Sequence, residues 1–425
     1  MPSETSPAVP AAAPERTLVV AGASVRGFAV SAARAGWHVF AADLFRDLDL
    51  VAAARTAVLV TGMEASATRN LVAACGSFPA AAWCYTGGLE NHPDVIAAVS
   101  TDRRLFGSPP AAVRAVRDVD RLADAVRRIG LLFPETLHAA GDVPGDGSFL
   151  VKPAASAGGR GIRRWHGESD PAGTTQPRHW QRYIRGRSWA ASYVLGHPAP
   201  RLLGVSRQFT GLRWCHAQPF AYCGSADMPL PRFGQDARQR LERLGRLLAE
   251  DFGLLGLVGV DLIVDQAGRT HVIEVNPRPT ASMELHERAL GESLAALHIA
   301  ACDGATSPRA SSPRVSTAWA KGVLFARSPV QVTPATVAAV IRCSTMWSDQ
   351  DGWPAIADIP AAPQAIAAGR PLVTLFATGP TPAAAWRSLR RRAASVDALL
   401  TTSSVPGVQP ASRRGTAAGA SAPTL

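Results

Sequence analysis

The chain has 425 residues, of which 47% are hydrophobic, and it carries a formal net charge of +11. Its arginines are spread along the sequence without a zinc-finger, basic-zipper or RNP-like pattern, so we expect anionic small-molecule partners and no nucleic acid. Because no stretch of about 18 apolar residues occurs and the first residues do not resemble a secretory signal, we expect no membrane partner and a cytoplasmic protein.

The first predicted domain, residues 16–104, shows the alternation of strands and helices that is typical of a parallel α/β sheet. A disordered tail is expected before it, over residues 1–15, which are rich in Ala, Pro and Ser. Strands are predicted at 17–22, 37–44, 56–62 and 81–88, with a helix over 23–36. This pattern predicts a Rossmann-like domain.

Two further domains are predicted, over residues 105–303 and 315–401, with a linker at 304–314 and a disordered tail at 402–425. The last domain is predicted to be small and to have an α+β fold. The elements expected in the two domains are a helix at 119–130, strands at 148–153, 257–265, 270–276, 320–326 and 371–379, and a helix at 381–400.

Lysine is rare in this chain. Of the 44 Lys+Arg residues, only Lys152 and Lys321 are lysines. A lysine retained among so many arginines is a candidate for a site that needs a compact ammonium group. The six cysteines are scattered without a C-x-x-C pair, which favours reduced thiols over a zinc site or disulfides.

The strand that ends in "EVNPRP" brings polar side chains together. Glu274, Asn276 and Arg278 are each two residues apart, so they are expected on one face, which Val272 continues as apolar. If Val264 lies opposite His271 in the preceding strand, Asp261 lies opposite Glu274. Two carboxylates and an amide are ligands that Mg²⁺ takes, although a solvated sheet edge is the alternative for Asp261 alone.

A glycine-rich stretch, "KPAASAGGRG", follows the apolar strand that ends at Lys152. Gly158, Gly159 and Gly161 allow the backbone to approach phosphate oxygens closely, although a flexible hairpin is the plain alternative. A lysine, a glycine loop and a magnesium-type cluster together are what a nucleoside triphosphate requires.

The order of these motifs resembles the ATP-grasp superfamily, in particular its carboxylase and carbamoyl-phosphate-synthase-like members. The resemblance implies an ATP-grasp fold, preceded by the Rossmann-like domain and followed by the small α+β domain. It implies that Lys152 contacts the nucleotide and that the glycine loop covers the phosphates. It also implies that Asp261, Glu274 and Asn276 hold Mg²⁺, with Mn²⁺ as an alternative, and that Arg278 stabilises the transferring phosphoryl group.

The same resemblance places adenine contacts along "QRYI", at Gln181, Arg182, Tyr183 and Ile184. The sequence departs from the family pattern at two positions. Arg117 stands where a second ATP-contacting lysine is usual, and Ser188 stands where many members have an acid that holds the ribose.

Substrate contacts are expected from two stretches outside these motifs. In the first domain they are Gly22, Ser24, Arg26 and Gly27, in a turn that could also be a dinucleotide fingerprint but has Ser24 at its second glycine position. In the stretch from residue 204 to 231, Arg207, Arg213 and Ser225 could meet an anionic acceptor. A buried sheet with a loop is the alternative for that stretch.

These observations predict an ADP-forming ligase that activates a carboxylate as an acyl phosphate and joins it to an amine. ATP and Mg²⁺ are the expected cofactors, a homodimer is one expected assembly, and the family association suggests one-carbon metabolism. Two alternatives keep the nucleotide site: a phosphotransferase that acts on a hydroxyl group, and a non-catalytic ATP sensor.

Overall fold

The computed structural model describes residues 16–63, 68–167, 177–228, 234–305, 317–348 and 352–402. The tails predicted at 1–15 and beyond 402, and most of the linker predicted at 304–314, lie outside these residues. Within the described part of the chain, every helix is too short or too polar to span a membrane. All six cysteines are free.

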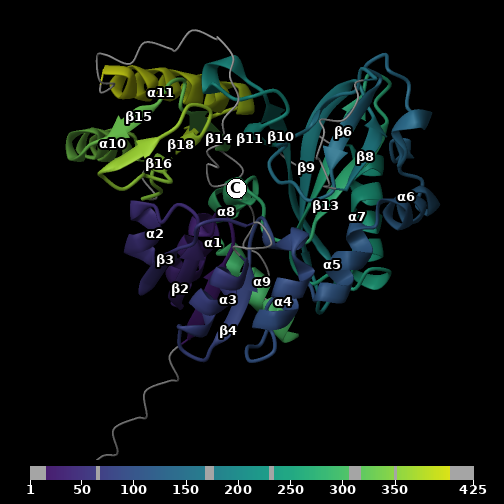
Figure 1. Cartoon of the computed structure of the whole chain (residues 1–425), viewed down its shortest axis with the longest axis horizontal. Helices are drawn as coiled ribbons and strands as arrows, with labels where there is room; N and C mark the ends of the chain where they lie inside the picture. The colour runs from purple at the N-terminus through teal and green to yellow at the C-terminus, as the bar shows by residue number, and fades with distance from the viewer. Residues whose placement is uncertain are drawn as a thin grey trace, which may run out of the picture.

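The N-terminal part is a parallel sheet of four strands in the order β3-β2-β1-β4, flanked by helices. It lies at the bottom of the view in Figure 1. The strands predicted there are confirmed. The elements are β1 (Thr17–Ala21), α1 (Arg26–Arg34), β2 (His38–Asp43), α2 (Leu48–Ala53), β3 (Thr56–Leu59), α3 (Thr68–Gly76), β4 (Ala82–Tyr85), η1 (Leu89–Asn91) and α4 (Pro93–Val99).

Next along the chain is a small antiparallel sheet in the order β5-β8-β6-β7, preceded by two helices. Helix α6 begins after Asp118, whose side chain accepts a hydrogen bond from the backbone N–H of Arg121 at 3.0 Å. The elements are α5 (Pro110–Arg117), α6 (Val119–Arg128), β5 (Thr136–Leu137), η2 (Ala140–Asp142), β6 (Phe149–Pro153), β7 (Arg163–Arg164) and β8 (Arg178–Arg182).

An eight-stranded sheet in the order β13-β12-β9-β10-β11-β14-β18-β16 forms the rest of the framework. It includes strands from both sides of the linker predicted at 304–314, because β11 pairs with β14. Its first elements are β9 (Gly186–Leu195), β10 (Arg201–Thr210), η3 (Arg213–Cys215), β11 (Tyr222–Met228), α7 (Gln235–Glu250), β12 (Gly256–Asp265), β13 (Thr270–Asn276), α8 (Met283–Leu290) and α9 (Leu294–Asp303). The last are β14 (Ala318–Phe325), β15 (Val330–Val332), α10 (Pro334–Trp347), β16 (Ile356–Ala357), β17 (Gln364–Ile366), β18 (Pro371–Gly379) and α11 (Pro382–Thr402).

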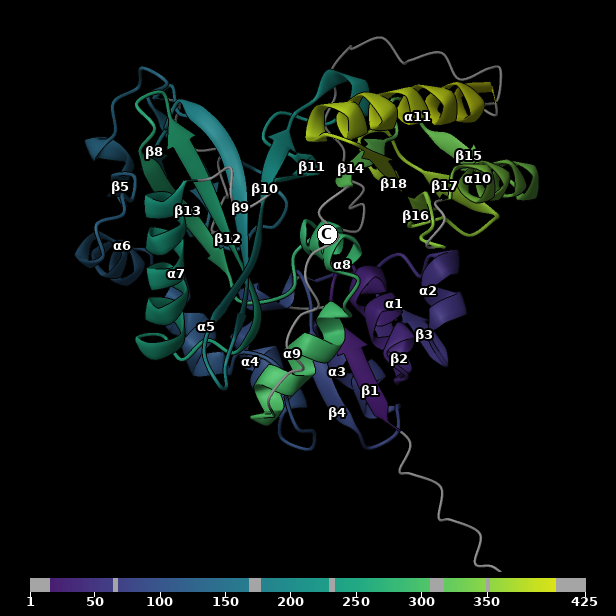
Figure 2. The same cartoon turned by 180° about the vertical axis from the view of Figure 1, so that it is seen from behind.

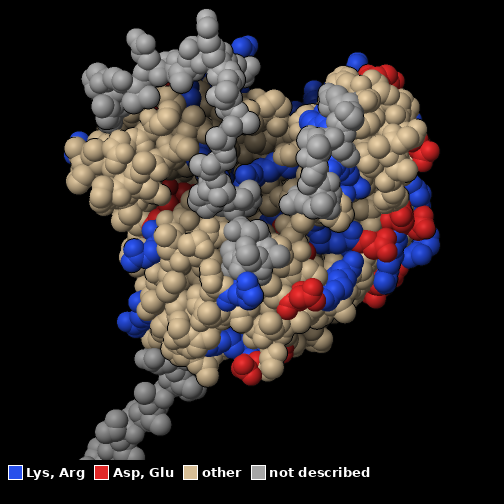
Figure 3. Space-filling model, in the orientation of Figure 1, with Lys and Arg blue, Asp and Glu red and all other residues tan. Residues whose placement is uncertain are grey.

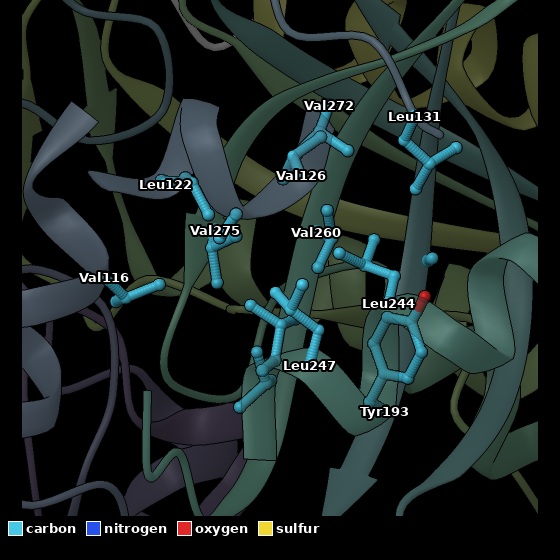
Figure 4. Packing of buried hydrophobic residues seen from close by; sticks show 14 of the residues in the cluster. Val116, Leu122, Val126, Leu131, Tyr193, Leu244, Leu247, Val260, Val272 and Val275 are labelled. Atoms are coloured by element: carbon cyan, nitrogen blue, oxygen red, sulfur yellow. The ribbon is translucent and has the colours of Figure 1, made fainter. Parts of the chain in front are cut away.

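One hydrophobic core fixes the β12–β13 hairpin on its helices. Leu244 and Leu247 of α7 pack with Val260 of β12 and Val275 of β13, as Figure 4 shows. Full burial of one such side chain contributes about 1.5–3 kcal/mol, so this face of the hairpin is held firmly. Figures 1 and 2 both place α8 in the centre, where the three parts of the molecule meet.

Candidate active site

The β12–β13 hairpin brings two carboxylates together. Asp261 pairs with Glu274, as the sequence predicted, but Val264 pairs with Thr270, so the predicted pairing of Val264 with His271 is wrong. A bulge causes the difference, because Ile273 is an extra residue in β13 between the two registers.

The bulge also changes which residues share a face. Val272 lies in the core together with Val275, three residues away, whereas strict alternation would have kept Val272 beneath Glu274. The prediction that Val272 continues the face of Glu274 is therefore wrong. The effect of the extra residue is to turn Glu274 out of the core.

Asp261 lies among hydrogen-bond donors. Its carboxylate accepts from the amide of Gln208 at 2.9 Å and from the amide of Asn276 at 3.2 Å. Burial, and next the charge of Glu274, raise the pKa of Asp261 to about 6. Two facing carboxylates with an amide at a strand end form a site that favours a bound cation.

Arg117 reaches this site from the end of α5. Its guanidinium is 3.7 Å from the Glu274 carboxylate and donates to the backbone carbonyl of Ala154 at 2.5 Å. Ala154 is two residues beyond Lys152. Arg117 therefore links the hairpin to the strand that carries the lysine.

Lys152 is buried on β6, with 8% of its surface exposed. Its ammonium group donates to the side-chain oxygen of Gln181 on β8 at 3.2 Å. His179 pairs with Lys152 across the same two strands. Burial, and next the charge of Lys152, lower the pKa of His179 to about 4, so this imidazole is neutral near pH 7.

The glycine loop closes against β11 and the segment before it. Gly158, Gly159 and Gly161 all have positive φ, at 65°, 82° and 72°. The carbonyl of Gly158 accepts from the backbone N–H of Tyr222 at 3.2 Å. A Cβ on Gly159 would lie 2.1 Å from the carbonyl oxygen of Phe220, so this approach requires glycine.

The other residues predicted to contact ATP lie on β8, at its end and on β9. The backbone N–H groups of Arg182 and Tyr183 donate to the carbonyls of residues 135 and 148, each at 2.8 Å. Contacts from these two residues to adenine would therefore not use these N–H groups. Ile184 follows β8, and Ser188 pairs with Ile263 of β12; all four assignments stay predictions.

Arg278 follows the end of β13 and is held from the first domain. Its guanidinium lies 2.7 Å from the carboxylate of Glu90, which is 1% exposed. It also donates to the side-chain oxygen of Asn276 at 3.1 Å. This arrangement fixes the guanidinium between Glu90 of the first domain and the oxygen-rich strand end, which is the end of β13 at Glu274 and Asn276.

Part of the chain matches a known family of domains. Residues 118–282 match the family described as the ATP-grasp domain. This part of the chain has the ATP-grasp fold. A search of curated proteins gives no match.

Solved structures share the fold of the ATP-grasp domain and its flanking parts. Biotin carboxylase from Campylobacter jejuni has a TM-score of 0.64 and 14% identity, over 86% of this chain and 87% of that one. Carboxyaminoimidazole ribonucleotide synthase from Aspergillus clavatus, complexed with ATP, has a TM-score of 0.67 and 15% identity, over 91% and 99%. N5-carboxyaminoimidazole synthetase from Staphylococcus aureus has a TM-score of 0.62 and 12% identity, over 89% of this chain and 97% of that one. The predicted fold class is confirmed.

A cavity of about 370 Å³ adjoins the ATP-grasp residues. Arg278 and Gly158 line it, together with Ser24, Arg26 and Gly27 from the first domain. Figure 3 shows basic side chains in the hollow at the centre of this face. The cavity is therefore a candidate site for an acceptor, next to the residues that are predicted to bind the nucleotide.

Four predicted substrate residues do not line this cavity. Gly22 packs against Thr86, since a Cβ there would lie 2.2 Å from the threonine hydroxyl. Arg213 lies in η3, and Ser225 is buried on β11.

Arg207, the fourth, lies over the rings of Trp189 and Phe209, 5.6 Å from each centroid. The cavity wall does not support these four assignments. The alternative of a buried sheet with a loop matches β10, η3 and β11.

Part of the cavity wall is a buried group of charges that the sequence did not reveal. Arg26 donates to both carboxylate oxygens of Asp358, at 2.7 and 3.0 Å, and also to Glu284. Lys321 donates to Glu284 and, at 3.0 Å, to the carbonyl of Ala281. Although burial alone would raise it, Arg26 and Lys321 hold the pKa of Glu284 well below its usual range.

Glu90 is a second residue that the sequence reasoning missed. It lies just after β4, and an acid beyond the carboxyl end of a parallel strand is a usual place for a functional residue. That signal was present in "TGGLEN".

Proposed function

We propose that the chain is an ADP-forming ligase that activates a carboxylate with ATP and joins it to an amine. The observation that carries the proposal is the position of Arg278. It is bonded to Asn276 at the oxygen-rich strand end and also lines the cavity beside Gly158. A phosphoryl donor and an acceptor bound in these two places would meet at one guanidinium.

The reaction has two steps. A carboxylate oxygen bonds to the γ-phosphorus of ATP while the bond to the bridging oxygen breaks and ADP leaves. The amine nitrogen then bonds to the carbonyl carbon, the carbon–oxygen bond to phosphate breaks, and inorganic phosphate leaves. The proton lost by the amine passes to solvent.

The residues at the strand end fit a hard divalent cation. Asp261, Glu274 and Asn276 would hold Mg²⁺. The raised pKa of Asp261, caused by burial and by the charge of Glu274, supports a cation between the two carboxylates. When bound, the ion supplies charge that offsets the phosphate oxygens. Mn²⁺ has the same ligand preference and stays an alternative.

The remaining roles belong to side chains and backbone of this chain. Glu90 keeps the Arg278 guanidinium oriented toward charge that develops on the phosphoryl group. Lys152, oriented by Gln181, would contact the nucleotide phosphates. The glycine loop, docked on Tyr222, would exclude the water that hydrolyses an acyl phosphate.

The relatives support this class of substrate. One solved structure of the Aspergillus clavatus synthase contains ADP and 5-aminoimidazole ribonucleotide, and a biotin carboxylase domain dimer contains MgADP and bicarbonate. We propose anionic carboxylate and amine substrates for this chain. The homodimer, the cytoplasmic location and the link to one-carbon metabolism stay predictions.

A screen of carboxylic acids with amines, measuring ADP and free phosphate separately, tests the proposal. A ligase releases both in equal amounts, and only when the acid is present. ADP without free phosphate would identify a phosphotransferase instead. Nucleotide binding without either product for any acceptor pair would identify a sensor.

Glu274→Gln is expected to weaken the use of Mg-ATP, because a neutral amide balances a divalent cation less well than a carboxylate. ADP formation measured against magnesium concentration should shift to higher magnesium and recover in part there. Glu242→Gln on α7 is a matched control, since the two side chains are 38% and 37% exposed. An unchanged magnesium dependence in Glu274→Gln would remove Glu274 from the metal site.

A further inference from the structure

The charged wall of the cavity has more acids than bases. The charged side chains that line it are four acids, Asp47, Glu284, Glu287 and Asp358, and three bases, Arg26, Arg278 and Lys321. Asp43 and Asp49 do not line the cavity but act on Asp47 through their charge. Buried charges of one sign are costly unless partners balance them. An excess of buried carboxylates therefore needs a proton or a cation to balance its negative charge.

The other acids around Asp47 have hydrogen-bond donors. Asp43 accepts from three backbone N–H groups at 2.7–2.8 Å. Asp49 accepts from two more at 2.9 and 3.1 Å. Glu284 and Asp358 are bonded to Arg26, and Glu284 also to Lys321.

Asp47 is different. It stands at the N-terminal end of α2 but makes no capping bond, and no other side-chain hydrogen bond within the described residues. Only 7% of it is exposed, and it lines the cavity. Burial, and then the charges of Asp358, Asp43 and Asp49, raise the pKa of Asp47 to about 8, against the opposing effect of Arg26.

The cations of the wall are already engaged. Arg26 is bonded to Glu284 and Asp358, and it also lies 3.4 Å from Asp49. A metal ion fits poorly, since no group of three or more His, Cys, Asp or Glu side chains in the described ranges is arranged to hold one. In the free protein a proton neutralises Asp47 near pH 7, and an organic cation from a substrate is the group that would take the place of this proton.

We infer that the substrate in this cavity carries a primary ammonium group that pairs with Asp47, on an otherwise apolar body. The apolar part follows from the other lining side chains, which include Phe28, Phe45, Leu257, Met283 and Leu294. The inference rests on the proposed function, whose amine substrate it describes; the ammonium group would lose one proton to solvent before its nitrogen attacks the carbonyl carbon. An ammonium ion would supply the hydrogen-bond donor that Asp47 lacks among the described residues.

Calorimetric titration with three chloride salts tests this pairing without turnover: butylammonium, cyclohexylammonium and 1,4-butanediammonium. Butan-1-ol and cyclohexanol are the uncharged counterparts. At least one ammonium probe should bind the wild-type protein, and its alcohol counterpart should bind at least about tenfold more weakly. Asp47→Asn should weaken ammonium binding by about 10- to 100-fold, the usual range for a hydrogen bond to a charged group.

Asp94→Asn is the control, because the Asp94 side chain is 91% exposed. It should bind the probes as the wild type does. Failure of all three ammonium salts to bind the wild type, or equal binding by Asp47→Asn, would overturn the inference. ADP-forming ligation with no ammonium binding refutes only this inference, whereas ammonium binding with no turnover for any acceptor pair refutes only the proposed function.

Stability gives a second test. In the unfolded chain Asp47 has an ordinary pKa of about 3.9, and in the folded chain the pKa is about 8. Between these values the folded protein holds a proton that the unfolded chain lacks, so the contribution of Asp47 to stability falls as pH rises.

Asp47→Asn removes this loss, and its unfolding free energy relative to wild type should therefore increase from about pH 5 to about pH 8. Urea unfolding at both pH values measures the difference. A variant less stable than wild type at the higher pH would mean that Asp47 is a structural group with partners of its own.

Discussion

Arg278→Ala is expected to lower kcat by roughly 10² to 10³ while the KM for ATP changes much less. The guanidinium is fixed by Glu90 and Asn276 before substrates bind, so it meets charge that develops during phosphoryl transfer. A contact of this kind acts mainly in the transition state. Steady-state ADP formation across ATP concentrations measures both constants.

Two companion variants separate catalysis from folding. Arg278→Ala leaves the buried carboxylate of Glu90 without its partner, which destabilises by about 3–5 kcal/mol in typical cases. The double variant Arg278→Ala with Glu90→Gln removes that charge and should recover stability but not kcat. Arg269→Ala, at the turn of the same hairpin, should keep normal turnover, since its side chain is 66% exposed. Normal kcat in the Arg278 variants would give Arg278 a structural role.

Lys152→Arg is expected to bind ATP about 10- to 100-fold more weakly than the wild type does. Its affinity for ATP should be almost as low as that of Lys152→Ala. Lys152 is buried between strands and bonded to Gln181, so a longer planar fork cannot occupy its place. Equilibrium binding of ATP in the presence of magnesium measures the loss. Lys152→Met keeps the length without the charge and should also bind weakly.

Thermal unfolding of the three Lys152 variants shows whether each is folded. Folded Lys152→Arg with the ATP affinity of the wild type would mean that this lysine is a leftover of an arginine-rich composition. Because 42 of the 44 basic residues are arginines, the arginine variant is the stricter comparison.

The sequence predicted local features of the site well. Apolar runs and turns placed the β12–β13 hairpin, and Asp261 does face Glu274. The bulge at Ile273 could not be seen, because Val272 and Val275 are both apolar and either could have been the buried one. Packing against α7 buries both Val272 and Val275.

Contacts between distant segments were beyond the sequence. Arg278 and Glu90 are 188 residues apart, and Arg26 and Asp358 are 332 apart. Periodicity describes neighbours along one element, so it says nothing of such pairs. The same limit hid the pairing of β11 with β14, which carries the large sheet into the third predicted domain and sets Lys321 beside Ser225.

Transfer of heavy oxygen tests the acyl-phosphate account most directly. Once an acid substrate is found, it is prepared with heavy oxygen in its carboxylate, and the phosphate released with the amide product is analysed by mass. The account predicts one labelled oxygen in each phosphate, because a carboxylate oxygen becomes the bridge to phosphorus and leaves with it. Unlabelled phosphate formed together with the amide would contradict it.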